Sequence, residues 1–127
     1  MLNIIIKGRI PSKKNSKIMI CRGKYPILIS NPKFQSWNTE QLWLLKRFKT
    51  SQSIEKCDIR ITFHAPDKRA ADLSNKAESL MDLLVEAGII KDDNWFVVNS
   101  LNLEFGGVDV EDPRAEINIK EKALPKR

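Results

Sequence analysis

The sequence predicts an α+β (α/β) fold, with one small domain in which a mixed β-sheet of about four strands packs against two main helices. The chain has 127 residues, of which 42% are hydrophobic, and this is enough for one core but too little for two ordinary ones. Several short segments alternate apolar and polar residues with the period of two that is typical of strands. Longer segments repeat apolar residues at helical spacing. The sequence contains no internal repeat or linker, so a single domain over residues 1–127 is expected.

The N-terminal part is expected to form a strand, a basic loop and a hairpin. Residues 2–7 are rich in isoleucine and end at a glycine, which favours a buried strand. Residues 10–17 mix proline, serine and asparagine with three lysines, which is typical of a basic loop or simply of a solvated turn. Residues 18–21 and 27–30 flank the turn at 22–24 and are expected to pair as a short hairpin.

A first helix is expected over residues 33–49, with Pro32 at its start, where proline is favoured. Its apolar residues fit one face only loosely, and its aromatic residues are expected in the core rather than stacked on DNA. Lys46, Arg47 and Lys49 crowd the C-terminal end. Positive charge is favoured there by the helix dipole and is also placed to meet phosphate.

The central part predicts a strand and a second helix. Every second residue from Cys57 to Phe63 is apolar, which indicates a half-buried strand over residues 57–64. Apolar residues then recur at steps of three and four, which predicts a helix over residues 73–87. Asp72 is a natural N-cap for this helix, and Gly88 is typical of its C-terminal end.

The C-terminal part is expected to add two strands to the sheet. Residues 95–105 follow a polar turn and are apolar enough for a strand, and residues 106–113 are expected to form a loop. Residues 114–120 alternate apolar and polar side chains, which predicts a half-buried strand. Residues 120–127 are expected to be a frayed basic tail.

The charge of the chain favours a polyanionic partner, and nucleic acid is the first candidate. Lys and Arg number 22 against 16 Asp and Glu, which gives a net charge of +6 and a pI near 9.4. Part of this excess lies in the tail, which is alternatively just a solvated terminus.

The cysteine and histidine content argues against a zinc protein, and the distribution of hydrophobic residues argues against a membrane or secreted protein. Cys21 and Cys57 are far apart and the chain has a single histidine, which argues against a zinc site of the usual ligand set and for free thiols in a reducing compartment. No apolar run approaches the roughly 20 residues of a membrane span, and the N-terminal apolar run is too short for a signal peptide. A cytoplasmic protein that does not contact a membrane is therefore expected.

Carboxylates flank the second helix beside basic residues, which is how a metal-dependent phosphodiesterase site can be built. Asp72 precedes the helix, and Asp92 and Asp93 follow it. Two carboxylates about 4 Å apart repel by roughly 4 kcal/mol at an effective dielectric constant near 20, and a divalent cation relieves that repulsion. Mg²⁺ usually takes only one or two protein carboxylates plus water and substrate phosphate. Helix caps and solvated turns explain the same residues without a metal.

These residues resemble the RusA family of Holliday-junction resolvases. The resemblance rests on the block His64-x-Pro66-Asp67-Lys68-Arg69-x-x-Asp72-Leu73-x-Asn75, on Asp82-Leu83-Leu84, on Ala87-Gly88 and on Asp92-Asp93. Weaker similarity in Pro11-Ser12, in Asn15 and in residues 114–120 extends it over essentially the whole chain. The combined signature is fairly specific, whereas an isolated Asp-Asp pair is not.

The resemblance implies a RusA-like fold and a crossover junction endodeoxyribonuclease. Such an enzyme depends on Mg²⁺, for which Mn²⁺ may substitute, and resolves four-way DNA junctions by paired symmetric nicks in DNA recombination and repair. The resemblance further implies a homodimer and a bacterial, phage or prophage origin.

The resemblance also assigns roles to individual residues. Asp72 and Asp93 match the metal-binding catalytic aspartates, and Asn75 and Asp92 match positions that support the site. Lys76 is expected to stabilise the charge that develops in the transition state. The expected DNA contacts, which position the backbone without reading sequence, are Lys13, Lys14, Asn15, Lys17, Lys68 and Arg69.

Two positions depart from the family pattern. Ser74 stands where the family has a further catalytic aspartate, and Glu78 stands where some members have a catalytic lysine. Glu78 is either a replacement metal ligand or an exposed glutamate. The alternative functions are a non-catalytic junction-binding protein that Ser74 has inactivated and a general nucleic-acid-binding module.

Overall fold

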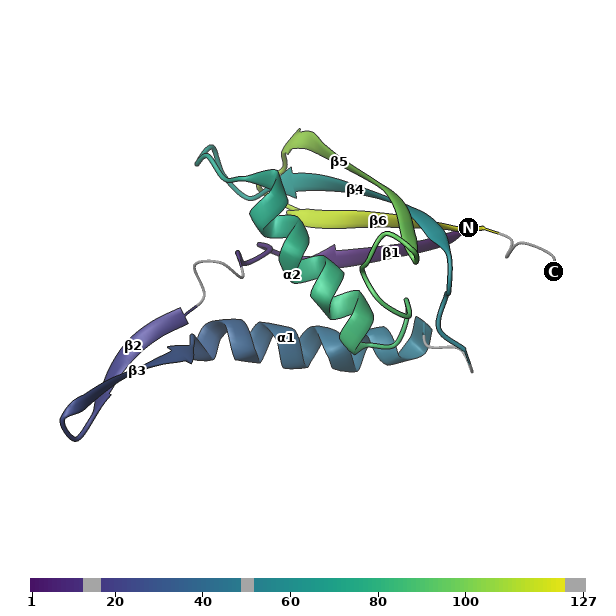
Figure 1. Cartoon of the computed structure of the whole chain (residues 1–127). Coiled ribbons are helices and arrows are strands. Elements are labelled where there is room, and N and C mark those ends of the chain that lie inside the picture. Colours follow the sequence, from purple (N-terminus) through teal and green to yellow (C-terminus); the bar gives the residue numbers. More distant parts are fainter. Residues whose placement is uncertain (13–16, 49–51, 123–127) are drawn as a thin grey trace.

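A four-stranded mixed sheet with the strand order β1-β6-β4-β5 forms the centre of the protein (Figure 1). The structure is a computed structural model that describes residues 1–12, 17–48 and 52–122. The sheet strands are β1 (Leu2–Lys7), β4 (Cys57–Ala65), β5 (Val98–Val108) and β6 (Arg114–Glu121). This arrangement confirms the predicted α+β class and the mixed sheet of four strands.

Two helices and a separate hairpin complete the described part. The helices are α1 (Pro32–Leu45), which continues into the 3-10 helix η1 (Lys46–Phe48), and α2 (Leu73–Glu86). The hairpin consists of β2 (Lys17–Arg22) and β3 (Tyr25–Ser30) and extends away from the sheet (Figure 1). In Figure 1, α2 crosses in front of the sheet and α1 lies beside α2.

Parallel pairing of β4 with β5 determines the path of the chain. The other two pairings in the sheet, β1 with β6 and β4 with β6, are antiparallel. Parallel neighbours require a long crossover connection, and α2 is the helix of that connection. The segments before and after α2, which contain Asp72 and Asp93, are therefore parts of one crossover.

The core lies between α2 and the sheet. Leu80, Leu83 and Leu84 of α2 are completely buried, as are Ile61 and Ile117 on the two central strands. The alternation predicted for residues 57–64 and 114–120 is confirmed, because the inward residues of β4 and β6 are buried and the outward ones are not.

Helix α1 begins as predicted but ends earlier. Asn31 caps it by accepting a hydrogen bond of 2.9 Å from the backbone of Lys33, and Pro32 lies in the first turn. The helix gives way to η1 after Leu45, so the expected end at residue 49 is wrong. Trp43 is 68% exposed, so the expectation that all aromatic residues of this helix are buried is also wrong.

The predicted bounds of the strand at residues 95–105 and the predicted start of the frayed tail are also wrong. Residues 95–97 form a turn, and β5 begins only at Val98 and continues to Val108. Hydrogen bonds from the backbone of Val97 and Val98 to the Asn94 carbonyl hold the turn in place of strand pairing. Strand β6 includes Glu121, so the start of the expected frayed tail is ordered, and residues 123–127 lie outside the described residues.

Within the described residues, no helix is long and apolar enough to cross a membrane.

Replacing a buried leucine of α2 should destabilise the protein far more than replacing an exposed one of α1. Leu80 is completely buried and Leu44 is 40% exposed. We expect Leu80→Ala to lower the free energy of unfolding by about 2–5 kcal/mol and Leu44→Ala to lower it by less than about 1 kcal/mol. Urea unfolding followed by circular dichroism measures both changes, and equal losses would contradict the assignment of the core.

The two cysteines should differ in reactivity. Cys57 is buried, and burial together with the nearby Asp58 and Glu121 carboxylates raises the pKa of its thiol to about 11. Because the thiolate is the reactive form, Cys57 should not react with a maleimide in the native protein at pH 7.5, whereas the exposed Cys21 should. Mass spectrometry should find one label in native protein and two after denaturation. Labelling of native Cys57 would show that this part of the core opens readily.

Candidate active site

Asp72 occupies the N-cap position of α2 without using its side chain as a cap. The prediction that Asp72 is the N-cap residue is confirmed, but its carboxylate accepts no capping hydrogen bond. It accepts a hydrogen bond of 3.1 Å from the Asn75 side-chain amide instead. The Asn75 amide therefore orients the Asp72 carboxylate, which makes no capping hydrogen bond to the backbone N–H groups of the helix. This contact also supports the predicted role of Asn75 as a residue that orients the site.

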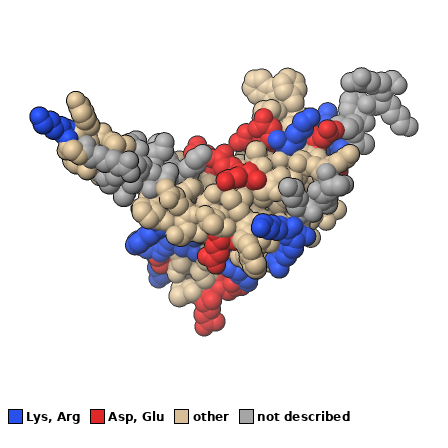
Figure 2. All heavy atoms as spheres, turned by 90° about the horizontal axis from the view of Figure 1, so that it is seen from below, with Lys and Arg blue, Asp and Glu red and all other residues tan. Residues whose placement is uncertain are grey.

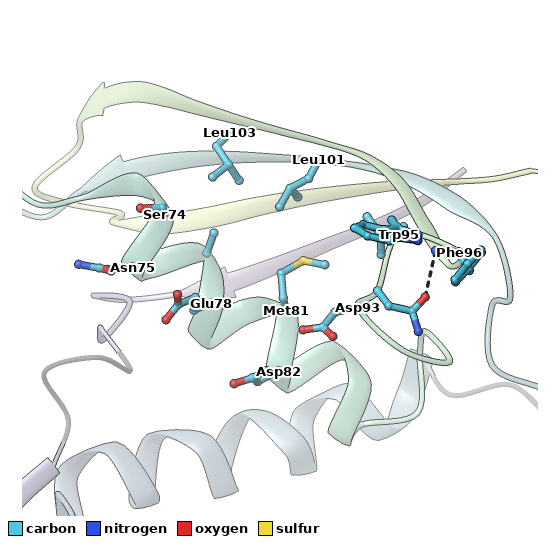
Figure 3. Close-up of a pocket in the computed structure, with 13 residues that line it drawn as sticks. Ser74, Asn75, Glu78, Met81, Asp82, Asp93, Trp95, Phe96, Leu101 and Leu103 are labelled. Carbon is cyan, nitrogen blue, oxygen red and sulfur yellow. Dashed lines mark hydrogen bonds between the residues drawn. The ribbon is translucent and has the colours of Figure 1, made fainter.

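One face of α2 borders an open groove that contains three carboxylates, here called the acidic groove. Glu78 and Asp82 come from the helix, and Asp93 comes from the loop that follows it (Figure 3). Ser74 lies one turn before Glu78 on the same helix face, since residues four apart are neighbours on a helix. The remaining lining residues are Asn75, Ala77, Met81, Asn94, Trp95, Phe96, Val98, Leu101 and Leu103.

The environment of Asp93 disfavours its charged form. Burial first, then the adjacent carboxylate of Asp92 and the charge of Asp82, raise the pKa of Asp93 above its usual range. Crowding of like charges in this way is relieved by a bound cation. Hard carboxylate oxygens are also the ligands that Mg²⁺ prefers. The acidic groove therefore contains donors of the type that Mg²⁺ prefers.

Asp92 organises the loop that presents Asp93. One Asp92 carboxylate oxygen accepts a hydrogen bond of 2.7 Å from the Asp93 backbone, and the other accepts one of 3.1 Å from the Asn94 side chain. These contacts fix the turn immediately before β5. The supporting role that the resemblance implies for Asp92 stays a prediction.

A second cavity, here called the basic pocket, lies at the N-terminal end of α2. Its lining includes Asp72 and Lys76, together with Arg9 and Arg69. Lys76 donates a hydrogen bond to the Ile10 carbonyl. Burial, followed by the charges of Arg9 and Arg69, lowers the pKa of Lys76. Four cationic side chains, those of Arg9, Arg69, Lys76 and Arg114, thus line the same pocket as Asp72.

Asp67 holds the two arginines of the basic pocket in position. Its carboxylate pairs with Arg9 and, at 3.0 Å, with Arg69. These contacts, led by the hydrogen bond from Arg69, keep the pKa of Asp67 well below its usual range. A substrate phosphate would compete with Asp67 for the same guanidinium groups.

Asn75 lies at the boundary between the acidic groove and the basic pocket. It lines both of them, whereas Asp72 lines only the basic pocket and Asp93 and Glu78 line only the acidic groove. Asp72 and Asp82 are ten residues apart, which is about 15 Å along a helix axis. This is far more than two Mg–O bonds of about 2.1 Å can bridge. In the described part of the chain, no three His, Cys, Asp or Glu side chains are grouped closely enough to hold a metal ion.

The remaining predicted site residues are located as follows. Ser74 lines the acidic groove, beside Glu78. Lys68 is exposed in the segment before α2, and Lys17 is the first residue of β2. Lys13, Lys14 and Asn15 lie outside the described residues. On the face shown in Figure 2, basic and acidic side chains form separate groups rather than one continuous basic surface.

Sequence reasoning gave no site role to Arg9, and it considered Asp82 only as a residue that either orients a basic partner or borders the site. Arg9 joins the basic pocket because the chain that follows β1 runs along α2, where Lys76 and Ser79 donate hydrogen bonds to the Ile10 and Pro11 carbonyls. Nothing local in the sequence indicates this contact. Asp82 had a usable signal, because it follows Ser74 and Glu78 at steps of four and so shares their side of the helix.

The chain matches the family described as endodeoxyribonuclease RusA over residues 8–120. Among curated proteins, it is 29% identical over 88 residues to the crossover junction endodeoxyribonuclease RusA of Aquifex aeolicus (strain VF5), and the match covers 68% of each chain. The family match includes the residues that line both cavities, all of β4 and β5, and β6 apart from its last residue, and it begins directly after β1. The chain therefore belongs to the RusA endodeoxyribonuclease family and is a nuclease.

Proposed function

We propose that the protein is a Mg²⁺-dependent endodeoxyribonuclease that resolves four-way DNA junctions by paired symmetric nicks. The observation that carries this proposal is the acidic groove next to a pocket with four cationic side chains. The first provides oxygen ligands for a divalent cation, and the second provides partners for DNA phosphates. The name of the Aquifex aeolicus relative, crossover junction endodeoxyribonuclease, supports a branched substrate.

The residues that would hold the metal are Asp93 and Glu78, with Asp82 as an additional carboxylate of the same groove, whereas Asp72 lines the neighbouring basic pocket. When bound, Mg²⁺ polarises a phosphoryl oxygen and lowers the pKa of a bound water. Asn75 keeps the Asp72 carboxylate oriented through its hydrogen bond. Asp92 does the same for the loop that carries Asp93.

The basic pocket would bind the DNA backbone beside the scissile phosphate. Arg9 and Arg69 can exchange Asp67 for phosphate oxygens, and an arginine makes such contacts with two parallel hydrogen bonds. Lys76, whose lowered pKa reflects its partial burial, would donate to an oxygen that gains charge in the transition state. Contacts of this type position the DNA without reading its sequence.

Paired nicks require two active sites related by symmetry, so we propose that the protein acts as a homodimer. A four-way junction has two-fold symmetry, and a two-fold dimer presents two identical sites to it. Membership of an endonuclease family favours this enzyme over the alternative of a protein that binds junctions without cutting them.

Neutralising Asp93 should abolish cleavage without abolishing binding. With Asp93→Asn we expect nicking of a synthetic four-way junction in Mg²⁺ to fall by roughly 100-fold or more, the loss typical when one fixed electrostatic group is removed from a catalytic site. Asp58→Asn is the matched control, because Asp58 lines neither the acidic groove nor the basic pocket and its carboxylate accepts a hydrogen bond of 2.8 Å from Ser100.

Gel electrophoresis of end-labelled junctions measures the rate and the symmetry of the cuts. Absence of nicking by the wild type in Mg²⁺ and Mn²⁺, or undiminished nicking by Asp93→Asn, contradicts the proposed function.

Restoring the family's second aspartate should change the metal requirement. Ser74→Asp adds a fourth carboxylate to the acidic groove, so we expect the Mg²⁺ concentration for half-maximal nicking to fall several-fold. Without metal, the new like-charge pair with Glu78 should cost about 0.2–0.5 kcal/mol of stability, as is usual four residues apart on a helix.

The control for this substitution is Ser36→Asp, at an exposed position of α1 away from the groove. It should change neither the magnesium dependence nor the thermal stability in the absence of metal. An identical magnesium titration for Ser74→Asp and the wild type would show that position 74 does not face the ion.

A further inference from the structure

Two large aromatic side chains stand exposed at the rim of the acidic groove. Trp95 is 79% exposed and Phe96 is 77% exposed, and both line the groove that contains Asp93 (Figure 3). They follow Asp93 by two and three residues, so they are attached to the same turn. Exposed aromatic groups of this size next to a site are typical of binding surfaces.

The turn that carries the two rings is held by its own hydrogen bonds. The Asn94 side chain accepts hydrogen bonds from the backbone of Phe96 at 3.0 Å and of Val97 at 3.3 Å. The Trp95 carbonyl accepts one of 2.9 Å from the Asn99 side chain. The rings are therefore presented by a fixed backbone, which lowers the entropy cost of binding on them.

The rings leave aromatic faces open to a ligand. Their centroids are 6.2 Å apart and their planes meet at 67°, which is an edge-to-face contact. In such a contact only one ring uses a face, so each ring keeps at least one face that the other does not cover. A flat partner can stack on such a face, and every nucleobase has one.

The adjacent carboxylates distinguish a DNA base from a protein partner. A protein packed over Trp95 and Phe96 would close the groove above Glu78, Asp82 and Asp93 and remove their charges from water, which is costly without compensating partners. A nucleobase that stacks on the exposed rings can leave the carboxylates open to water or to a divalent ion, and such an ion would also offset the repulsion between the carboxylates and the DNA phosphates.

We propose that Trp95, supported by Phe96, stacks on a nucleobase that is left unpaired next to the phosphate being cut. This inference rests on the proposed function and adds to it a contact that duplex DNA, whose bases are already stacked, cannot provide. The pair would thus contribute to the preference for branched over linear DNA.

The test compares Trp95→Ala with Trp95→Phe and with Trp43→Ala, which removes another exposed tryptophan, from α1. Binding is measured by fluorescence anisotropy in Ca²⁺ without Mg²⁺, on a four-way junction, on a linear duplex of the same sequence and on a single strand. A junction with 2-aminopurine at the branch point reports directly on stacking. Sedimentation velocity records the oligomeric state of each variant.

We expect Trp95→Ala to weaken binding to the junction and to the single strand on the order of tenfold, the usual size for one base stacked on an aromatic ring. Its affinity for the duplex should change less than about twofold on the same reasoning. Trp95→Phe should keep most of the affinity, and Trp43→Ala should keep all of it. The 2-aminopurine signal of the wild type should be lost in Trp95→Ala.

Three results would overturn the proposal. They are unchanged junction and single-strand affinity in Trp95→Ala, equal losses on junction and duplex, and a loss of dimer in Trp95→Ala, which would identify the aromatic pair as a contact between two copies of the chain. Because this binding assay contains no cleavage step, it decides the stacking proposal even if the wild type nicks no junction.

Discussion

The parallel pairing of β4 with β5 is the constraint on which the site depends. Parallel neighbours cannot be joined by a tight turn, so the chain leaves the sheet after Ala65 and returns to it at Val98. Helix α2 and the loops on either side of it fill this interval. Asp72, Glu78 and Asp93 therefore all lie on one connection, and the sheet determines where its two ends are anchored.

The burial of α2 separates its core positions from its site positions. The buried residues Leu80 and Leu84 face the sheet, while Ser74, Glu78 and Asp82 recur at steps of four along the side that borders the acidic groove. If α2 were rotated about its axis so that the carboxylates pointed away from the acidic groove, its buried leucines would become exposed to water. Core packing thus fixes the orientation of the site, and the site needs no additional scaffold.

Local patterns in the sequence predicted most of the elements, and tertiary contacts explain the rest. The alternation in β4 and β6 and the helical spacing in α2 are local, so these elements were predicted to within one or two residues. The late start of β5 depends on the Asn94 turn, and Arg9 enters the basic pocket only through the path of β1 into the next loop. Neither contact has a local sequence signature. The division of Asp72 and Asp93 between two cavities likewise depends on how the loop after α2 folds back along the helix.

The charge of the acidic groove explains how Ser74 is compatible with a metal site. Glu78, Asp82 and Asp93 give the groove three negative charges when all are ionised, so one divalent ion leaves a charge of about −1. An aspartate at position 74 would leave about −2, which would oppose a phosphodiester more strongly unless a second ion bound. We propose that Glu78, four residues along the helix, supplies the carboxylate that is missing at position 74.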